Sequence, residues 1–361
     1  MGCCFSKNEL HQISSDNYKN KISITSISKS CYSILHCLSY TKELTKYFLN
    51  KYDYNNNNNK VSNEYYNLLI NLWKEKNFSY LYSPYNLTSF INNNRNSSSN
   101  NNQLNDGKSL LIYLFDNIHN ELNTKNNNKG NNIIKKPTLI QSDKQLTLQI
   151  FFDYFKNNYN SVISNLFYGT YEIIFNCVQC EKPNYKYEIF NFLEFSLNEI
   201  DSFFGIKMNT VIDRGLRFKS TVKIIELSKC FEYHNKEKAI TTKKYKCIFC
   251  NNEQFFNFSS KIFSMPNYLI LILNNEKGNA YKVNYPEILD MEKYITHNEI
   301  ASDFSLYSVI EKKDKEDEYI AYCRDFNNIW YKYDNNEVRQ CQNKEYLKVL
   351  PCFLFYEVIN K

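Results

Sequence analysis

Two pairs of cysteines have the spacing of metal ligands. Two other residues separate the thiols of each pair, and residues 181–246 separate the pairs, which are Cys177, Cys180, Cys247 and Cys250. Four thiolates suit one tetrahedral Zn²⁺, and a site with four protein ligands and no open position is structural, not catalytic. Both pairs lie in strand-like sequence, and the wide gap favours a long hairpin system that brings them together. The sequence predicts structural zinc in preference to two pairs of ordinary cysteines.

The first six residues carry a lipidation pattern. Gly2 becomes the terminal residue after removal of Met1, and Ser6 stands at the position that N-myristoylation requires. One myristoyl chain gives marginal, reversible membrane binding, so stable anchoring needs a second signal, which palmitoylation of Cys3 and Cys4 would supply. We expect residues 1–20 to be a tether on the cytosolic face of a membrane. The alternative is a chance terminus with two spare cysteines.

The composition narrows the class of protein. The chain has 361 residues, of which 43% are hydrophobic, so it can bury a substantial core. Its net charge of +6 is small and its basic residues are scattered, which argues against nucleic-acid binding. Without a run of 18 apolar residues we expect no membrane-spanning segment. Twelve cysteines without a secretory signal indicate reduced thiols in the cytoplasm.

Helical patterns come first along the chain and strand patterns later. Apolar spacing predicts helices at residues 65–73, 110–122 and 146–155, with Leu148, Phe151, Phe152 and Phe155 on one face of the last. Short β-branched and aromatic stretches predict strands at residues 171–175, 222–227, 268–273, 306–310, 319–323 and 352–358. This order is typical of an α+β protein. Asn-rich tracts at 54–60, 92–107 and 123–132 are predicted to be loop insertions within one domain at 21–358.

An ordered series of motifs extends over most of the chain. The motifs lie at residues 141–143, 165–169, 188–197, 245–250, 265–273, 285–291, 318–334 and 353–357. Their succession resembles the ubiquitin-specific protease family of cysteine-type deubiquitinases. The resemblance implies a papain-like right hand with a helical thumb (about 21–160), and a β-rich palm with zinc-bearing fingers (about 161–358). In that fold the palm and fingers grip ubiquitin and guide its C-terminal tail into the cleft between thumb and palm.

The histidine box of this family corresponds to residues 318–334. Tyr319, Tyr322 and Arg324 match it, but Glu318 stands at the position of the catalytic histidine, and Asp317 replaces the glycine before it. A glutamate has an ordinary pKa near about 4.3, so at neutral pH it is an anion and a poor proton donor. It would also raise the pKa of a nearby thiol. The resemblance implies that Asp334, which would orient the histidine, is retained.

The cysteine box is also altered. Cys31 matches the nucleophile, but the Met-Asn pair that should follow two residues later is absent. Two residues correspond to about 200° of helix rotation, so either Cys31 keeps its place or Lys29 takes the nucleophile position. The resemblance places the oxyanion asparagine at Ser26, and two loop glycines are replaced by Ser23 and Ser28. Loss of one oxyanion donor typically lowers turnover by about 10²–10³.

Three hypotheses follow from these replacements. The first is a lipid-anchored pseudo-deubiquitinase that binds ubiquitin or another protein without cleaving it. The second is a divergent, active thiol-dependent deubiquitinase with Cys31 as nucleophile and a substitute base such as His297. The third is a membrane scaffold that does not recognise ubiquitin. Hydrolysis separates the second from the others, and ubiquitin binding separates the first from the third.

Overall fold

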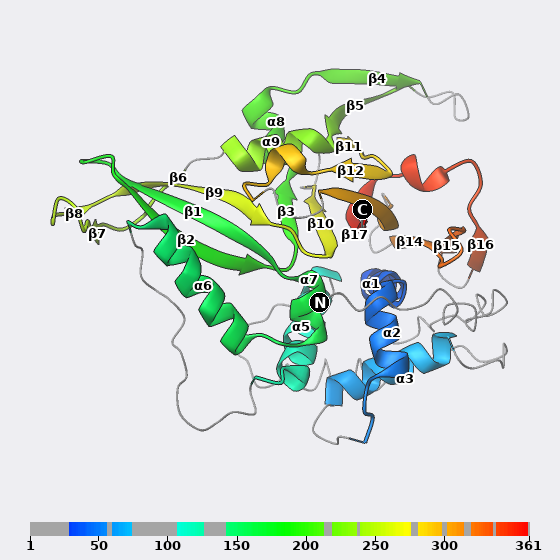
Figure 1. Cartoon of the computed structure of the whole chain (residues 1–361). Helices are drawn as coiled ribbons and strands as arrows, with labels where there is room; N and C mark the ends of the chain where they lie inside the picture. Colours follow the sequence, from blue (N-terminus) through cyan, green and yellow to red (C-terminus); the bar gives the residue numbers. More distant parts are fainter. Residues whose placement is uncertain are drawn as a thin grey trace, which may run out of the picture. The chain divides into compact units, whose positions relative to one another are not determined.

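The computed structural model describes residues 29–55, 60–73, 107–125, 142–212, 219–236, 239–275, 281–297, 302–313, 319–334 and 337–359 (Figure 1). The chain divides into two compact units. Unit 1 comprises Met1–Leu122 and Tyr307–Tyr346, and unit 2 comprises Asn123–Leu306 and Leu347–Lys361. Several residues of the sequence predictions lie outside the described ranges, namely Gly2, Cys3, Cys4, Ser23, Ser26, Ser28, Asp317 and Glu318, with the tract at 92–106 and parts of the other two tracts.

Unit 1 combines four described helices with an antiparallel meander of strands. The helices are α1 (Lys29–Ser39), α2 (Lys42–Asn50), α3 (Lys60–Trp73) and α5 (Gly107–Leu122). The strands are β13 (Asp303–Lys312, whose first residues belong to unit 2), β14 (Tyr319–Arg324), β15 (Trp330–Asp334) and β16 (Glu337–Gln340), followed by the 3₁₀ turn η5 (Glu345–Leu347). Hydrogen bonds connect the strands in the order β16-β15-β14-β13.

Helix α1 is the central helix of unit 1 because it is apolar on nearly every side. Tyr32, Ile34, Leu35, Cys37 and Leu38 are each at most 1% exposed. A helix that is apolar all round must be buried, and α1 packs on β14 and on α5. Its residues therefore face both the sheet and the helical layer of this unit.

Two contacts fix the helices around α1. A Cβ atom at Gly107 would lie 2.7 Å from Cγ1 of Ile34 and 3.3 Å from the carbonyl oxygen of Ser30, so only glycine allows α5 to begin so close to α1. The carboxylate of Glu121 accepts hydrogen bonds from the backbone N–H groups of Val61 (3.0 Å) and Ser62 (2.8 Å). An acceptor with negative charge stabilises the free N–H groups at a helix start, here that of α3.

Unit 2 contains the remaining elements. Its helices are α6 (Lys144–Asn158), α7 (Val162–Phe167), α8 (Leu197–Phe204) and α9 (Leu227–Lys236), with the 3₁₀ turn η4 (Glu292–Tyr294). Its strands are β1 (Gly169–Cys177), β2 (Pro183–Phe190), β3 (Leu193–Ser196), β4 (Met208–Ile212), β5 (Lys219–Glu226), β6 (Ala239–Ile240), β7 (Tyr245–Lys246), β8 (Glu253–Gln254), β9 (Phe256–Ser264), β10 (Tyr268–Asn274), β11 (Tyr281–Asn284), β12 (Ile288–Asp290) and β17 (Pro351–Val358).

The strands of unit 2 form several sheets. The long strands have the order β2-β1-β9-β6, and the hairpin β7–β8 lies at their left-hand end in Figure 1. Strand β10 pairs antiparallel with β17 and parallel with β3. Its residues 268–273 are all buried, as an apolar strand covered on both faces requires. Strands β11, β5 and β4 form a third sheet, and β12 pairs with the first residues of β13.

The predicted helices and strands occur where the sequence patterns place them, and the α+β class is confirmed. Two details differ. Leu227 begins α9 instead of ending a strand, because strand β5 ends at Glu226. Phe152 is 45% exposed although it was expected on the buried face of α6, where Thr147 and Phe151 are the buried residues. No helix within the described ranges has the length and apolar character needed to cross a bilayer.

Candidate functional site

The four cysteines of the predicted metal site come together in unit 2. The Sγ atoms of Cys177 and Cys250 are 3.9 Å apart, those of Cys180 and Cys247 are 3.6 Å apart, and all four lie within 4.8 Å of one another. Four sulfurs around a tetrahedral Zn²⁺, each at about 2.3 Å, would be separated by about 3.8 Å. The donor set therefore suits a zinc ion, and the two sulfur pairs at 3.6 and 3.9 Å have nearly the spacing that it requires.

The two cysteine pairs form matching turns. Glu181 and Asn251, each directly after the second cysteine of its pair, have φ angles of 56° and 59°. Their N–H groups donate to the carbonyl oxygens of Cys177 (2.8 Å) and Cys247 (2.9 Å). The left-handed residue turns the chain back so that both thiols of a pair face the same point.

Antiparallel pairing brings the two turns together over the long sequence gap. Cys177 ends β1 and lies opposite Phe256 of β9, while β7 and β8 flank the second pair. The side chains of Phe175 and Phe256 pack against the cysteines and cover them from one side. The predicted hairpin system that joins the pairs is confirmed.

The thiols of this cluster differ in acidity. Burial raises the pKa of Cys247, but the N–H groups of Cys250 and Phe249 outweigh it and lower this pKa to about 7. At Cys180 the N–H group of Lys182 favours the thiolate, yet burial and the neighbouring thiols raise its pKa to about 11. One thiolate therefore forms readily and hinders the others, so four thiolates need a cation among them.

Cys31, the predicted nucleophile position, lies in the first described turn of α1. Its side chain is 5% exposed, and Tyr32 beside it is 1% exposed. Helix α1 runs without interruption from Lys29 to Ser39. The side chain of Lys29 lies outside the described residues, as do Ser26 and Glu318.

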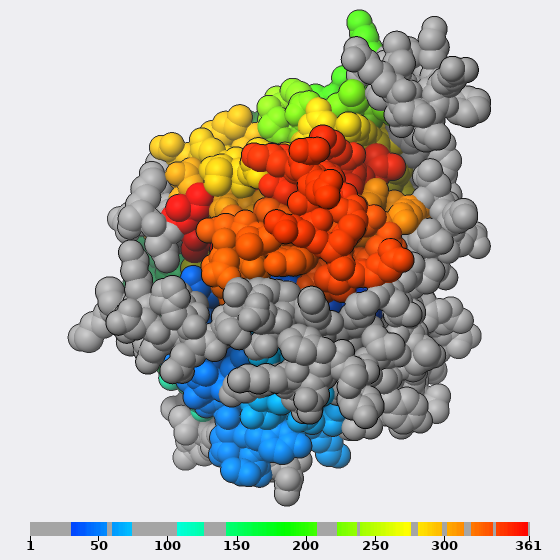
Figure 2. Space-filling model, turned by 90° about the vertical axis from the view of Figure 1, so that its right-hand side faces the viewer, coloured from blue at the N-terminus to red at the C-terminus, as the bar shows by residue number. Residues whose placement is uncertain are grey.

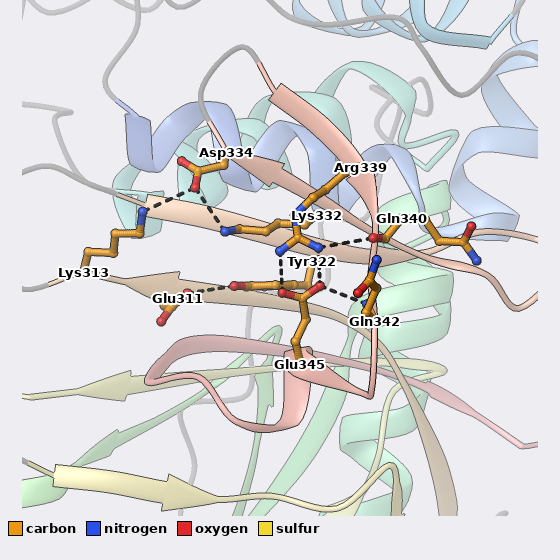
Figure 3. A network of polar contacts seen from close by, with 9 residues as sticks. All are labelled: Glu311, Lys313, Tyr322, Lys332, Asp334, Arg339, Gln340, Gln342 and Glu345. Carbon is orange, nitrogen blue, oxygen red and sulfur yellow. Dashed lines mark hydrogen bonds and ion pairs between the residues drawn. The ribbon is translucent and has the colours of Figure 1, made fainter. Parts of the chain in front are cut away.

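Asp334 ends β15 in unit 1, where two ammonium groups contact its carboxylate. The Nζ atom of Lys332 is 3.2 Å away and that of Lys313 is 3.3 Å away (Figure 3). Burial raises the pKa of Asp334, but the two lysines outweigh burial and hold the pKa below its usual range. Asp334, which we expected from the sequence to orient a histidine, is thus an ion-paired anion.

The surroundings of Asp334 form a wider polar network on one face of the meander. Side chains alternate along a strand, so Lys332 and Asp334 share a face and Tyr333 projects to the other. The guanidinium of Arg339 binds both carboxylate oxygens of Glu345 at 2.6 Å, and the hydroxyl of Tyr322 donates to Glu311 at 2.9 Å (Figure 3). In Figure 2 the strands β14, β15 and β16, coloured orange to red, form one continuous face.

The opposite face of β15 meets a buried histidine. The ring of His36 on α1 stacks on Tyr333 at 4.2 Å and meets the edge of Tyr32 at 4.6 Å. The Nε2 atom of His36 has no hydrogen-bond partner within the part of the chain that the structure describes. Complete burial lowers the pKa of His36 to about 3, so the imidazole is neutral and inaccessible to substrate.

The other described histidines are His119, His234 and His297. His119 on α5 is buried, and burial lowers its pKa. Burial lowers the pKa of His234 on α9 to about 4, and its ring lies 5.4 Å from Tyr171. His297 stacks on Phe263 in unit 2, with ring centroids 4.9 Å apart. Within unit 1, therefore, neither described histidine is exposed.

Sequence reasoning missed Lys313, Lys332 and the burial of His36. Lys332 stands two residues before Asp334, and this spacing in a predicted strand would have placed both side chains on one face. No local signal identifies Lys313, because it reaches Asp334 from the end of another strand.

Comparison with known proteins agrees with this architecture. The model of the family described as ubiquitin carboxyl-terminal hydrolase matches residues 24–356. The chain belongs to the ubiquitin carboxyl-terminal hydrolase family.

Individual relatives are distant. Mouse ubiquitin carboxyl-terminal hydrolase 17-like protein B is 24% identical over 206 residues, which are 55% of this chain and 39% of that protein. Human ubiquitin carboxyl-terminal hydrolase 15 is 27% identical over 190 residues, 48% of this chain and 18% of that protein. Zebrafish ubiquitin carboxyl-terminal hydrolase 48 is 27% identical over 133 residues, 33% of this chain and 13% of that protein. The chain thus matches well under half the length of these relatives.

Solved structures share the fold. A SAGA DUB module of Ubp8, Sgf11, Sus1 and Sgf73 bound to monoubiquitin has a TM-score of 0.64 at 17% identity, with 96% of this chain and 70% of that chain covered. A SAGA DUB module bound to ubiquitin aldehyde has a TM-score of 0.61 at 17% identity, with coverage of 96% and 71%. These likenesses establish the ubiquitin-specific protease fold for this chain.

Proposed function

We propose that this family member binds ubiquitin or a ubiquitinated protein without cleaving it. The observation that carries the proposal is the contact of Asp334 with both Lys332 and Lys313. In a thiol protease a carboxylate at this place would hold a neutral imidazole in position. Here two cations occupy the carboxylate, and the sequence supplies Glu318 where the imidazole would be.

The environment of Cys31 supports the same proposal. A nucleophilic thiol needs access to the carbonyl carbon that it attacks, and a base that removes its proton. Cys31 is only 5% exposed, so a substrate carbonyl has little access to its thiol. His36 lies five residues further along α1, and its complete burial lowers its pKa to about 3, so it is too weak a base to replace the missing histidine.

Ubiquitin is the proposed ligand because of the fold. The structural neighbours include modules bound to monoubiquitin and to ubiquitin aldehyde. A chain that keeps the fold while losing catalytic groups can keep a binding surface, because binding requires shape and polar complementarity but no proton transfer.

We further propose that Cys177, Cys180, Cys247 and Cys250 hold a structural Zn²⁺. The support is the sulfur spacing and the matched turns described above. Four thiolate ligands leave no position open for water or substrate. The ion would cross-link the ends of the long strands and take no part in proton transfer.

The N-terminal sequence supports a membrane location within this proposal. Gly2 followed by Cys3 and Cys4 fits myristoylation joined by palmitoylation, and two acyl chains anchor a protein stably. Ubiquitin binding would then take place at the cytosolic face of a membrane. Metabolic labelling with a myristate analogue, with Gly2→Ala as control, tests this part separately.

The deciding experiment combines hydrolysis and binding. Purified full-length protein is assayed on a fluorogenic ubiquitin C-terminal amide beside its Cys31→Ala variant, and ubiquitin affinity is measured by calorimetry on the same samples. We expect no hydrolysis by either protein and similar ubiquitin binding by both. Hydrolysis that disappears in Cys31→Ala would establish the divergent enzyme instead, and absence of both activities would favour the scaffold.

A further inference from the structure

Exposed apolar side chains gather around the metal-binding turns of unit 2. Of the thirteen large hydrophobic side chains that are exposed among the described residues, six lie at position 178 or within 240–255. We call them the fingertip patch: Val178 (50% exposed), Ile240 (62%), Tyr245 (50%), Ile248 (58%), Phe249 (39%) and Phe255 (39%). The other seven are scattered over both units, so the concentration at this end of the long strands needs a cause.

The six side chains lie on connected pieces of chain. The N–H group of Val178 donates to the carbonyl oxygen of Phe255 at 3.1 Å, which joins the first turn to the end of β8. Tyr245 lies opposite Gln254 in the β7–β8 hairpin. This hairpin lies at the free left-hand end of the long strands in Figure 1.

The metal-binding turns explain why these residues point outward. In each turn the two cysteines direct their thiols toward the cluster, so the residues between them project away from it. Val178 occupies that place in the first turn, and Ile248 and Phe249 occupy it in the second. A buried position for any of them would require the cluster to open.

Lysines accompany the fingertip patch. The Nζ atom of Lys182 lies 4.8 Å from the ring centre of Phe249, and that of Lys244 lies 5.6 Å from the ring centre of Phe255. Lys243 and Lys246 are also exposed. Against these four lysines the same turns and hairpin carry two acidic residues, Glu181 and Glu253. The patch is therefore rich in exposed apolar side chains and carries an excess of positive charge.

We propose that the fingertip patch is a docking surface for an anionic lipid membrane. Apolar and aromatic side chains that project from a rigid turn can enter the region between headgroups and acyl chains, while lysines beside them bind the acidic headgroups. Long lysine side chains suit this boundary, because the methylene groups cover apolar surface and the ammonium group stays in the polar layer.

Charge and shape favour a membrane over a protein partner. The patch consists of turn residues and a two-stranded hairpin at the end of the long strands. A bilayer accepts a projecting apolar turn without a matching cavity, whereas a protein partner would need a surface of complementary shape. This contact is separate from the proposed N-terminal anchor.

The test uses the full chain without its acyl groups, as the zinc-loaded Gly2→Ala protein. Co-sedimentation is measured with vesicles of phosphatidylcholine alone and with vesicles that contain about 30% phosphatidylserine. We expect binding to be about tenfold tighter to the anionic vesicles, and to weaken at high salt because the lysine contribution is screened. The double variant Ile248→Ser and Phe249→Ser should lower this affinity about tenfold.

A matched double variant provides the control. Leu146 and Phe203 are 47% and 51% exposed in the same unit but lie on α6 and α8, so Leu146→Ser with Phe203→Ser should change vesicle affinity less than about twofold. The proposal is overturned if neither vesicle binds, or if both double variants bind alike. It is also overturned if the fingertip variant loses ubiquitin affinity while vesicle binding is unchanged, because the patch would then belong to the ubiquitin-binding surface. None of these vesicle-binding results depends on whether Cys31 is catalytic.

Discussion

The carboxylate of Asp334 lies 3.2 Å from the ammonium group of Lys332, two residues earlier on β15. Lys313 completes the arrangement from the end of β13, at 3.3 Å. Two cations on one carboxylate favour its charged form strongly. The two ion pairs therefore connect Asp334, at the end of β15, to its own strand and to the end of β13.

Substitution of Lys332 by methionine should change the acid stability of unit 1. The pKa of Asp334 is depressed in the folded state, so its contribution is present above the unfolded pKa of about 3.9 and is lost as pH falls through the lower folded value. Lys332→Met should therefore lower the unfolding free energy by about 1 kcal/mol at neutral pH, and this difference should vanish in strong acid. Urea unfolding at several pH values measures it.

The control for this experiment is Lys229→Met. Lys229 forms a surface pair with Glu232 on α9 at 2.8 Å, and its side chain is 42% exposed. We expect little change there, because exposed pairs contribute little. Equal changes in unfolding free energy for Lys332→Met and Lys229→Met at all pH values would contradict a stabilising ion pair between Lys332 and Asp334.

Replacement of His36 by leucine should remove a pH dependence of stability. The folded pKa of about 3 lies below the ordinary value near about 6.5, so between these values the unfolded chain takes up a proton that the folded chain cannot. Native stability should fall on acidification from about pH 6.5 by roughly 1.4 kcal/mol per unit. His36→Leu should flatten this part of the curve. Identical slopes for both proteins would show that His36 titrates normally.

Cys31 should resist modification in the native protein. Its side chain is 5% exposed, so a maleimide reaches it only when the start of α1 opens. We expect labelling of Cys31 to be at least about a hundredfold slower in buffer than in denaturant. Mass spectrometry of the peptide that contains residue 31 gives both rates, and Cys352, which is partly exposed, is the internal comparison. Rapid labelling of Cys31 by a ubiquitin-based thiol probe would refute the burial of its thiol in the native protein.

Chelation should loosen the long strands of unit 2 but not unit 1. Four-cysteine zinc sites in small peptides have apparent binding free energies of roughly 10–16 kcal/mol, which are also folding free energies. Loss of zinc, or Cys247→Ser, should raise hydrogen exchange in β1 and β7 to β9, while α1 and α5 stay protected. Elemental analysis should find one zinc per chain. Cys352→Ser is the control, since Cys352 lies on β17 and outside the cysteine cluster. If zinc-free protein shows unchanged hydrogen exchange in β1 and β7 to β9, a structural zinc site at the four cysteines is excluded.

Much of the fold could be predicted from the sequence, because local periodicity carries it. The short aromatic and β-branched stretch of β14 and the continuous apolar run of β10 indicate strands directly. The spacing of the cysteine pairs likewise indicates shared ligands, since a turn of two residues directs both thiols to one point. The hairpin connection between the pairs also followed from their separation.

The burial and the contacts of the predicted catalytic residues could be learned only from the tertiary structure. The sequence by itself led us to expect that Glu318 stands at the position of a histidine and that Asp334 is retained. Only the packing of α1 on β14 decided that Cys31 and His36 are buried, and only the arrangement of the meander brought Lys313 to Asp334. The physical reason is that burial and cross-strand contacts join residues far apart in the chain, whereas periodicity and ligand spacing are properties of neighbouring residues.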